Sequence, residues 1–553
     1  MLALPIEVKA ETMGIGLSLN KSATVFLLGV GVAGCDRVAG RAEAPSAPAS
    51  SHGHVFVQVR SSVPNEVPVS GRLLIFMRQG SGDKSLNPGE FKAENTWIAA
   101  KEVRNLTSGD NVEVDADEVA YPKPFSAMLA GKYEAQAVLD VNHSYNYRGN
   151  SPANWISAVT SLGDWSPAAG AEPVLVLDRQ PEEGMKRAAV RLAGLAADRL
   201  KLANVRLEEM VSPALTRFWG RPVKISAWVI LPPHYSGRGP ATYPTVYWTH
   251  GFGGNLDSAL YNGNQIRERM NDNKMPPMIW VMLDESLPQG VHEFADSVNN
   301  GPWGTALTTE FLPYLESKYR MDAQPSGRLL TGHSSGGWAT LQLQVNYPGI
   351  FGGTWSTSPD PADFHDFSGV DLYAPNANLY RRADGSAVPI MRENGEVLAT
   401  MEQAAKQEEV LGIYGGQMAS FEWVFSPKGP DGAPRPMFDR KTGKINPEIA
   451  AYWRDHYDLA HLVETNWPQK GTDFKGKFHV TVGTSDTFYL DGAVHKLEAV
   501  LARLGDEPHF AYLKDRTHFD LYRVGEDPNG LWDEIGAEMY AIARPGVDWK
   551  ATR

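Results

Sequence analysis

Short hydrophobic runs alternate with polar residues along the chain from residue 54 to about residue 180. The alternation has a period of two, and Gly, Pro and Asn separate the runs, as is typical of β-strands joined by turns. The runs are 54–60, 71–77, 111–114, 131–139 and 172–177. They predict a small β-sandwich over residues 54–180. No group of its side chains suggests chemistry, so we expect a binding or spacing role.

A second pattern begins at about residue 205, where buried-type strands alternate with stretches of helical spacing. The strand-like runs are 223–231, 245–249, 278–283, 478–483 and 509–513, and the helical stretches are 307–318, 493–504 and 532–542. Pro313 should bend or restart the first of these helices. Strands that alternate with helices indicate a mostly parallel sheet covered on both faces. We therefore expect an α/β fold, a doubly wound sheet, over residues 205–545.

The periodicity weakens between residues 358 and 475, where Pro, Gly and Asp are frequent and one stretch, 396–411, has helical spacing. A segment this long exceeds a normal connection, so we expect a cap-like insertion that walls the substrate pocket. Residues 181–204 are charged and helical in pattern, which predicts a helical connector between the two domains.

The amino-terminal residues are typical of an exported protein. Residues 23–34 form a run of small and hydrophobic residues that follows Lys21 and ends at Cys35. The run is shorter than the roughly 20 residues that span a bilayer, but it suits the core of a signal peptide. Its last residues and Cys35 resemble the bacterial lipobox, in which the cysteine becomes the lipidated first residue after cleavage.

We therefore expect a lipoprotein-type signal peptide over residues 1–35, a lipid anchor on Cys35 and a periplasmic or cell-envelope location. Met13 would give a more typical signal length than Met1. A buried amino-terminal strand or helix is the alternative. Residues 36–53 are rich in Ala, Pro, Ser and Gly, which predicts a flexible tether.

Composition narrows the classes of function. Hydrophobic residues make up 42% and charged residues 21% of the 553 positions, which is ordinary for a soluble globular protein. The formal net charge of -13 argues against a nucleic-acid partner. A single cysteine excludes an internal disulfide framework and a multi-cysteine metal site.

The strongest motif is Gly332-His333-Ser334-Ser335-Gly336, which lies between a strand-like run and a helical one. Strand, tight turn and helix are the context of a nucleophile elbow, in which the glycines let the two arms close around a serine. Ser334 is therefore the predicted nucleophile. Ser335 is a weaker candidate, because its own frame would need a glycine where His333 stands. A glycine-rich helix start with an incidental serine is the structural alternative.

A serine hydroxyl needs a base, and a histidine suits that task when a carboxylate holds its ring. In doubly wound hydrolases these residues follow the chain order Ser, acid, His, each at the end of a strand. Asp486 follows the run 478–483, and His518 follows the run 509–513. Both are predicted site residues, although loops after strands are often polar in any case.

Other polar residues are weaker candidates for these roles. Asp491 is the fallback acid, but we expect it to cap the following helix. His479, His495 and His509 lie within predicted strands and helices, whereas site residues concentrate on loops.

An oxyanion hole needs a second backbone amide from an earlier loop. The segment 249–255, Thr-His-Gly-Phe-Gly-Gly-Asn, follows a strand and has the glycines for a close approach to substrate. We assign the role to the amides of Phe252 and Ser335. Such a loop taken alone is also compatible with a simple turn.

Asp360, Asp363 and Asp366 gather around His365. Such a group could ligate a divalent cation. We favour a polar turn organised by Asp and Pro, and a lining of the acyl or leaving-group pocket is a further option.

Several motifs together resemble the esterase D/enterochelin esterase-like branch of the α/β-hydrolases. They are the His-Gly-Phe-Gly-Gly loop, the Gly-His-Ser-Ser-Gly-Gly-Trp elbow, the segment 347–353, and the spaced Asp486 and His518. The resemblance covers about residues 205–545. It implies a triad of Ser334, Asp486 and His518, and it requires no metal or cofactor.

The branch includes feruloyl and acetyl esterases, siderophore-ester hydrolases, S-formylglutathione hydrolase and mycolyltransferases, and some members carry a β-sandwich before the hydrolase domain. The long segment 358–475 departs from the compact members and leaves the substrate open. We expect an exported serine esterase that acts on a small-molecule or polymer-borne ester. An acyltransferase with the same triad, a lipid-tethered binding protein and a peptidase are the alternatives, and the oligomeric state is open.

Overall fold

A computed structural model of the chain describes residues 53–64, 68–80, 82–83, 85–89, 91, 95–143, 153–181, 204–412, 414 and 416–550. The predicted signal peptide with Cys35, almost all of the tether and almost all of the connector lie outside these residues. No helix in the described part of the chain is both long and apolar enough to cross a lipid bilayer.

Two β-sheets share one hydrophobic core between residues 56 and 177. The larger sheet has the order β5-β3-β2-β6-β7, with β8 also paired to β6, and the smaller has the order β4-β1-β9. Fully buried Val57 and Leu175 of the small sheet pack with Ile75 and Ala137 of the large one. The strands are β1 (Phe56–Ser61), β2 (Val69–Gln79), β3 (Trp97–Leu106), β4 (Asn111–Asp115), β5 (Ala120–Tyr121), β6 (Gly131–Asp140), β7 (Trp155–Ile156), β8 (Thr160–Trp165) and β9 (Val174–Leu177), with one short helix η1 (Phe125–Ala127). The predicted β-sandwich fold is confirmed.

The alternating pattern does not predict β3. Its first residues after Trp97 are three consecutive buried ones, Ile98 to Ala100, and then Lys101 and Glu102 are both exposed. Consecutive buried and consecutive exposed residues break the period of two that identifies a half-buried strand. The sequence pattern therefore does not identify β3, which the structure shows paired antiparallel with β2.

The second domain is built on an eight-stranded sheet with the order β10-β11-β13-β12-β18-β19-β22-β23. β11 pairs antiparallel with both of its neighbours, β10 and β13. The other neighbours, from β12–β13 to β22–β23, pair in parallel. The strands are β10 (Val205–Val211), β11 (Lys224–Ile230), β12 (Thr245–Thr249), β13 (Ile279–Leu283), β18 (Arg328–His333), β19 (Gly353–Thr357), β22 (Phe478–Gly483) and β23 (His509–Leu513). Small two-stranded pairs are formed by β14 (Ser286–Leu287) with β15 (Gly290–Val291) and by β16 (Asp296–Ser297) with β17 (Gly301–Pro302).

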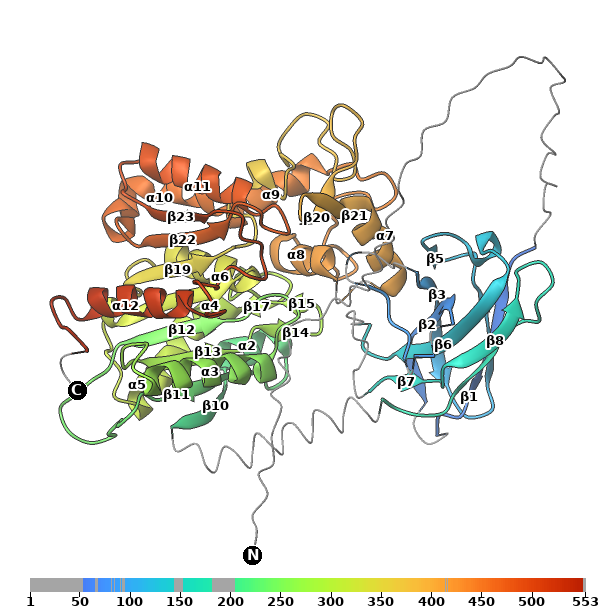
Figure 1. Ribbon diagram of the computed structural model, residues 1–553, viewed down its shortest axis with the longest axis horizontal. Coiled ribbons are helices and arrows are strands. Elements are labelled where there is room, and N and C mark those ends of the chain that lie inside the picture. Colours follow the sequence, from blue (N-terminus) through green and yellow to red (C-terminus); the bar gives the residue numbers. More distant parts are fainter. Residues whose placement is uncertain are drawn as a thin grey trace, which may run out of the picture. The chain divides into compact units, whose positions relative to one another are not determined.

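Helices cover both faces of this sheet, as the doubly wound prediction requires. Trp280 packs into the core under α3 and α12, whereas its neighbour Val281 packs into the core under α2, α4, η2 and α5. Successive residues of a strand point to opposite faces, so the two cores lie on opposite sides of the sheet (Figure 1). The helices are α2 (Pro213–Trp219), α3 (Leu256–Asn271), α4 (Trp303–Ala306), the π-helix η2 (Leu307–Phe311), α5 (Leu312–Lys318), η3 (Pro325–Gly327), α6 (Ser335–Asn346), α11 (Asp491–Arg503) and α12 (Leu531–Ala543).

Two local predictions in this domain have different outcomes. Pro313 lies in the first turn of α5, so the helix restarts there as expected. Asp491 is the first residue of α11 and not its cap, because Leu490 occupies the N-cap position. The prediction that Asp491 caps this helix is wrong.

The segment 358–475 is more regular than its sequence indicates. It contains η4 (Phe364–Asp366), a hairpin of β20 (Pro389–Glu393) and β21 (Glu396–Thr400), and the helices α7 (Met401–Leu411), α8 (Gln417–Phe425), α9 (Pro447–Tyr457) and α10 (Leu459–Phe474). The predicted helical stretch 396–411 is therefore wrong in its first five residues, which form β21. Three further helices, α8, α9 and α10, lie where the sequence pattern predicts none, and the Pro-, Gly- and Asp-rich segment 426–446 separates the first of them from the other two.

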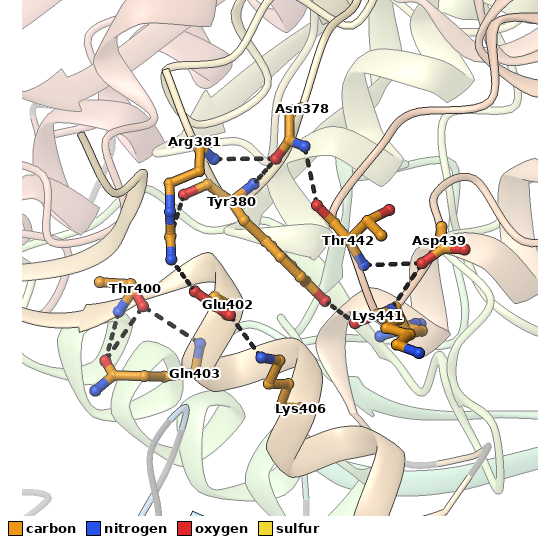
Figure 2. Close-up of polar contacts among 11 residues, drawn as sticks. Asn378, Tyr380, Arg381, Thr400, Glu402, Gln403, Lys406, Asp439, Lys441 and Thr442 are labelled. Carbon is orange, nitrogen blue, oxygen red and sulfur yellow. Dashed lines mark hydrogen bonds and ion pairs between the residues drawn. The ribbon is translucent and has the colours of Figure 1, made fainter. Parts of the chain in front are cut away.

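Polar side chains fix one of these connections, the loop 437–446 (Figure 2). The amide of Asn378 donates to the carbonyl of Thr442 at 2.9 Å. The hydroxyl of Tyr380 donates to the carbonyl of Arg440 at 2.7 Å. These bonds satisfy backbone carbonyls that no sheet or helix pairs, which holds an irregular segment in one conformation.

Candidate active site

Ser334 lies at the turn between β18 and α6, with a backbone φ of 60° and ψ of -127°. A non-glycine residue rarely adopts a positive φ, and such strain is concentrated at functional sites. The flanking glycines explain how the turn closes. A Cβ atom on Gly332 would lie 2.2 Å from the carbonyl oxygen of Gly336, and one on Gly336 would lie 2.4 Å from the carbonyls of Thr249 and His250. The elbow therefore requires glycine at both places.

His518 and Asp486 are hydrogen-bonded, with 2.9 Å between His518 Nδ1 and Asp486 Oδ2. Asp486 is fully buried and His518 is 5% exposed. The other carboxylate oxygen, Oδ1, accepts the backbone N–H of Phe488 at 2.9 Å. Burial alone would raise the pKa of Asp486, but the charge and hydrogen bond of His518 and the Phe488 amide bring it below its usual value.

His518 also lies next to the elbow. Its ring centroid is 4.4 Å from that of His333, the residue directly before Ser334. In this conformation the described residues include no hydrogen bond from the Ser334 hydroxyl to His518. Hydrogen bonds between catalytic groups are often long without substrate and tighten when it binds. Burial, helped by the charge of His518, lowers the pKa of His333 to about 3, so His333 is neutral beside the predicted base.

The loop after β12 approaches Ser334 closely. A Cβ atom on Gly251 would lie 2.9 Å from the Cβ atom of Ser334, so only glycine fits there. The loop is anchored by His250, whose Nε2 lies 3.0 Å from Asp284 Oδ1. In the described part of the chain, neither the Phe252 amide nor the Ser335 amide donates to a protein acceptor. Both N–H groups are available to an oxyanion at Ser334.

Asp360 is a further buried acid at the elbow. Its Oδ2 accepts the hydroxyl of Ser335 at 2.6 Å, and its backbone N–H donates to the carbonyl of Ser334 at 3.2 Å. Burial raises the pKa of Asp360 to about 6, and the hydroxyls of Ser335 and Ser334 and the charge of His518 limit the rise. From the sequence, Asp360 is only one member of the acidic group around His365, because β19, which leads to it, is not predicted by the hydrophobic pattern.

The acidic cluster around His365 does not converge. Asp363 accepts the backbone N–H of His365 at 2.9 Å, and Asp366 accepts that of Gly369 at 2.7 Å. Both bonds organise a turn, as the favoured interpretation expected. Among the described residues these four side chains do not form a group that could hold a cation.

The insertion contributes a side chain to the site. Gln417, the first residue of α8, has its amide nitrogen 3.4 Å from Ser335 Oγ and 3.4 Å from Asp360 Oδ2. Buried Glu408 of α7 accepts the backbone N–H groups of Met418 and Ala419, which fixes this end of α8. A residue of the insertion thus contacts Ser335, which directly follows the predicted nucleophile Ser334.

Glu408 is itself part of a buried ion network. Arg440 lies 3.2 Å from Glu408 and 2.8 Å from Glu422 of α8. Burial raises the pKa of Glu408, and the charge of Arg440 opposes the rise. Because the Tyr380 hydroxyl holds the Arg440 carbonyl, the loop 437–446 is linked through Arg440 to the helix that carries Gln417.

Aromatic rings surround His518. The ring of Phe488 packs edge-on at 4.9 Å, and that of Phe519 at 5.5 Å. Phe519 is 57% exposed, so this apolar surface reaches solvent beside the site. It can exclude water from the reacting groups and accept a hydrophobic part of a substrate.

The weaker candidates have other partners. Asp491 binds Arg392 at 3.1 Å. His495 stacks on Tyr512 at 4.0 Å, and His479 stacks on His509 at 4.7 Å. These contacts give each residue a structural role away from the elbow.

The sequence of this domain matches a known family. Residues 220–495 match the sequence model of the Esterase family, described as "Putative esterase". Esterase MT1326 of Mycobacterium tuberculosis (strain CDC 1551 / Oshkosh) and Esterase Rv1288 of Mycobacterium tuberculosis (strain ATCC 25618 / H37Rv) are each 33% identical over 154 residues. The aligned part covers 26% of this chain and 31% of each relative, so the chain spans about a third of the length of these curated relatives.

Solved structures give more distant neighbours. A ferulic acid esterase is 14% identical, with a TM-score of 0.37 over 62% of this chain and 97% of its own. FphF, a fluorophosphonate-binding serine hydrolase of Staphylococcus aureus, is 11% identical, with a TM-score of 0.36 over 62% of this chain and 98% of its own. An S-formylglutathione hydrolase from Agrobacterium tumefaciens is 14% identical, with a TM-score of 0.34 over 61% and 94%. These identities and TM-scores are too low to infer a substrate for this chain from these structures.

Proposed function

Residues 220–495 belong to the Esterase family, and on that premise we propose that the chain is a serine esterase that hydrolyses carboxylic esters. Ser334 attacks the ester carbonyl, His518 takes the serine proton and returns it to the leaving alcohol, and Asp486 orients His518. Water then cleaves the acyl-enzyme by the same proton transfers in reverse.

The observation that carries this proposal is the buried pairing of His518 with Asp486 beside the turn that holds Ser334. A carboxylate on Nδ1 leaves Nε2 of the ring unprotonated, which is the tautomer that a general base requires. The low pKa of Asp486 keeps it ionised at neutral pH, so it can also stabilise the imidazolium that forms during attack.

Two backbone amides support the same chemistry. The attack turns the carbonyl oxygen into an oxyanion, which needs fixed N–H donors in a site that excludes water. We assign this role to the amides of Phe252 and Ser335, whose loops meet at Gly251 and Ser334. Removal of one such donor typically costs about 10²–10³ in kcat.

Replacement of the nucleophile tests the proposal. In Ser334→Ala, turnover of 4-nitrophenyl acetate should fall at least about 10³-fold, because attack then depends on water without an activated serine. Ser326→Ala is the matched control, since Ser326 is an exposed serine in the turn before β18. Equal turnover by Ser334→Ala and the wild type, with both variants folded, would remove the assignment.

We also propose that the enzyme is exported and tethered to a membrane through a lipid on Cys35. The supporting features are the run 23–34, the cysteine that ends it and the tether-like composition of 36–53. Expressed in a bacterium, the wild type should sediment with membranes and be released by detergent, whereas Cys35→Ser should not sediment. Cytosolic wild type, or a Cys35→Ser variant that stays with membranes, would contradict the anchor.

A further inference from the structure

The loop that carries Asp486 runs from Thr484 to Leu490 and is called here the acid loop. It joins β22 to α11 and contains no helix or strand of its own. Tyr489 within it has a φ of 60°, in the left-handed region that few non-glycine residues adopt. Such a loop needs partners from outside to hold one conformation.

One residue of the insertion supplies several of these partners. Arg392, in β20, donates its Nε–H to the carbonyl of Asp486 at 2.8 Å. Its backbone N–H donates to the carbonyl of Thr487 at 2.8 Å, and its Nη2 lies 3.5 Å from the carbonyl of Thr484. Arg392 therefore reaches three carbonyls of the acid loop, including that of Asp486 itself.

The same guanidinium also contacts one side chain of the acid loop, Tyr489, and the first residue of α11, Asp491. Its Nη2 lies 3.1 Å from Asp491 Oδ1, and its central carbon lies 4.3 Å above the ring of Tyr489. The planar guanidinium of arginine can donate hydrogen bonds to a carbonyl and a carboxylate while it stacks on an aromatic ring. The ammonium of lysine cannot do all three. The Arg392 side chain is 23% exposed, so solvent weakens these contacts only in part.

Arg392 is held on a paired element. β20 and β21 form an antiparallel hairpin in which Arg392 lies opposite Val397. The hairpin continues directly into α7. Contacts between Arg392 and the acid loop thus join the loop to a folded part of the insertion.

The position of the Asp486 backbone decides where its carboxylate meets His518. The carboxylate is fixed on one oxygen by the Phe488 amide of the same loop and on the other by His518. A displacement of about 1 Å at a catalytic group can cost about 10²-fold in rate. A residue that holds the acid loop therefore controls the alignment of the base.

We propose that Arg392 is a positioning residue: from the insertion, it holds the acid loop so that Asp486 aligns His518 toward Ser334. This inference rests on the proposed esterase function. It gives the insertion a role in the catalytic machinery in addition to its contact with Ser335 and Asp360 through Gln417.

Kinetics of single and double variants test the proposal with 4-nitrophenyl acetate. Arg392→Ala should lower kcat about 10- to 100-fold with KM changed less than about threefold, because the acid loop moves while the substrate-binding surface stays. Arg392→Lys should recover little of the loss, since it keeps the charge but not the fork. Arg381→Ala is the matched control, because Arg381 is an arginine of the same insertion whose side chain binds Glu402 (Figure 2). Within the part of the chain that the structure describes, its hydrogen bonds go to Asn378, Tyr380 and Glu402 and not to the acid loop.

A double-mutant cycle separates positioning from a general loss of structure. Asp486→Asn should itself be strongly impaired, and adding Arg392→Ala to it should lower kcat less than about twofold further, because there is then no carboxylate to align. Arg392→Gln replaces Arg392→Ala in the cycle if the alanine variant does not fold. An unchanged kcat in Arg392→Ala, or an equal loss with and without Asp486, would overturn the positioning role. Wild-type kcat in Asp486→Asn would instead overturn the triad on which the proposal rests.

Discussion

His518 and Asp486 lie 32 positions apart in the chain, yet their side chains are 2.9 Å apart in a buried pair. The strands that precede them, β23 and β22, are parallel neighbours at the edge of the eight-stranded sheet. The carboxyl ends of parallel neighbours meet at one rim of a sheet, so the loops that follow them are brought together by the fold. The order of the strands alone therefore brings the acid and the base to the same rim of the sheet.

Two buried carboxyl groups near Ser334 have opposite pKa shifts. The pKa of Asp486 is lowered because His518 and a backbone amide outweigh its burial, and the pKa of Asp360 is raised to about 6 because burial outweighs its hydroxyl partners. Asp486 is therefore ionised at neutral pH, whereas Asp360 titrates just below neutral pH. The two carboxyl groups therefore change the stability of the protein in opposite directions as the pH varies.

Asp360→Asn should stabilise the protein at pH 8 and leave its stability unchanged near pH 4. A raised pKa means that the acid contributes stability below its unfolded pKa of about 3.9 and loses it as pH rises through about 6. The shift of about two units corresponds to at most about 3 kcal/mol. Thermal unfolding of both proteins at the two pH values measures this difference, and a variant less stable than the wild type at pH 8 would refute the argument.

Asp486→Asn should have the opposite effect. Its lowered pKa contributes stability above the unfolded value of about 3.9, and this stability is lost as pH falls through the folded value. The variant should be less stable than the wild type by about 1–2 kcal/mol at pH 7, and the gap should narrow below about pH 4. Calorimetric unfolding across this range checks the sign, and a gap that grows toward low pH would be inconsistent with it.

Gly336→Ala should lower both the stability and the activity. The new methyl group would lie 2.4 Å from the backbone carbonyls of Thr249 and His250, which cannot move without shifting the predicted oxyanion loop. Such overpacking typically costs about 1–3 kcal/mol. Gly349→Ala is the control, because no described atom lies within 4 Å of its added Cβ. Melting temperatures and ester turnover of the two variants decide the point: equal behaviour would mean that the elbow tolerates a side chain.

Most of the central sheet could be predicted because its strands are long hydrophobic runs, and the positions of Asp486 and His518 followed from the strand order. The strand β19 could not, because Ser356 and Thr357 make Gly353–Thr357 read as polar. Their hydroxyls donate to the carbonyls of Gly337 and Gly332 at 2.8 Å each, so the strand is buried without a hydropathy signal. A search for hydrophobic runs misses a buried strand whose polar side chains are hydrogen-bonded within the fold.

The insertion illustrates a second limit. Gln417 reaches Ser335 across 82 positions, and Arg392 reaches Asp486 across 94. Neither residue belongs to a motif, and each acts through a few hydrogen bonds that depend on how α8 and the β20–β21 hairpin pack. The elbow can be identified from a short sequence motif, because the turn itself requires its glycines. A single polar residue that acts through a long-range contact has no such motif around it.

The central claim is that Ser334 is an activated nucleophile, and covalent labelling tests it most directly. The folded protein is treated with a fluorophosphonate, digested, and examined by mass spectrometry, with heat-denatured protein as the control. A single adduct on the peptide that contains Ser334, absent from the denatured sample, is the predicted result. A folded protein that stays unlabelled, or an adduct elsewhere with Ser334 unmodified, would contradict the account.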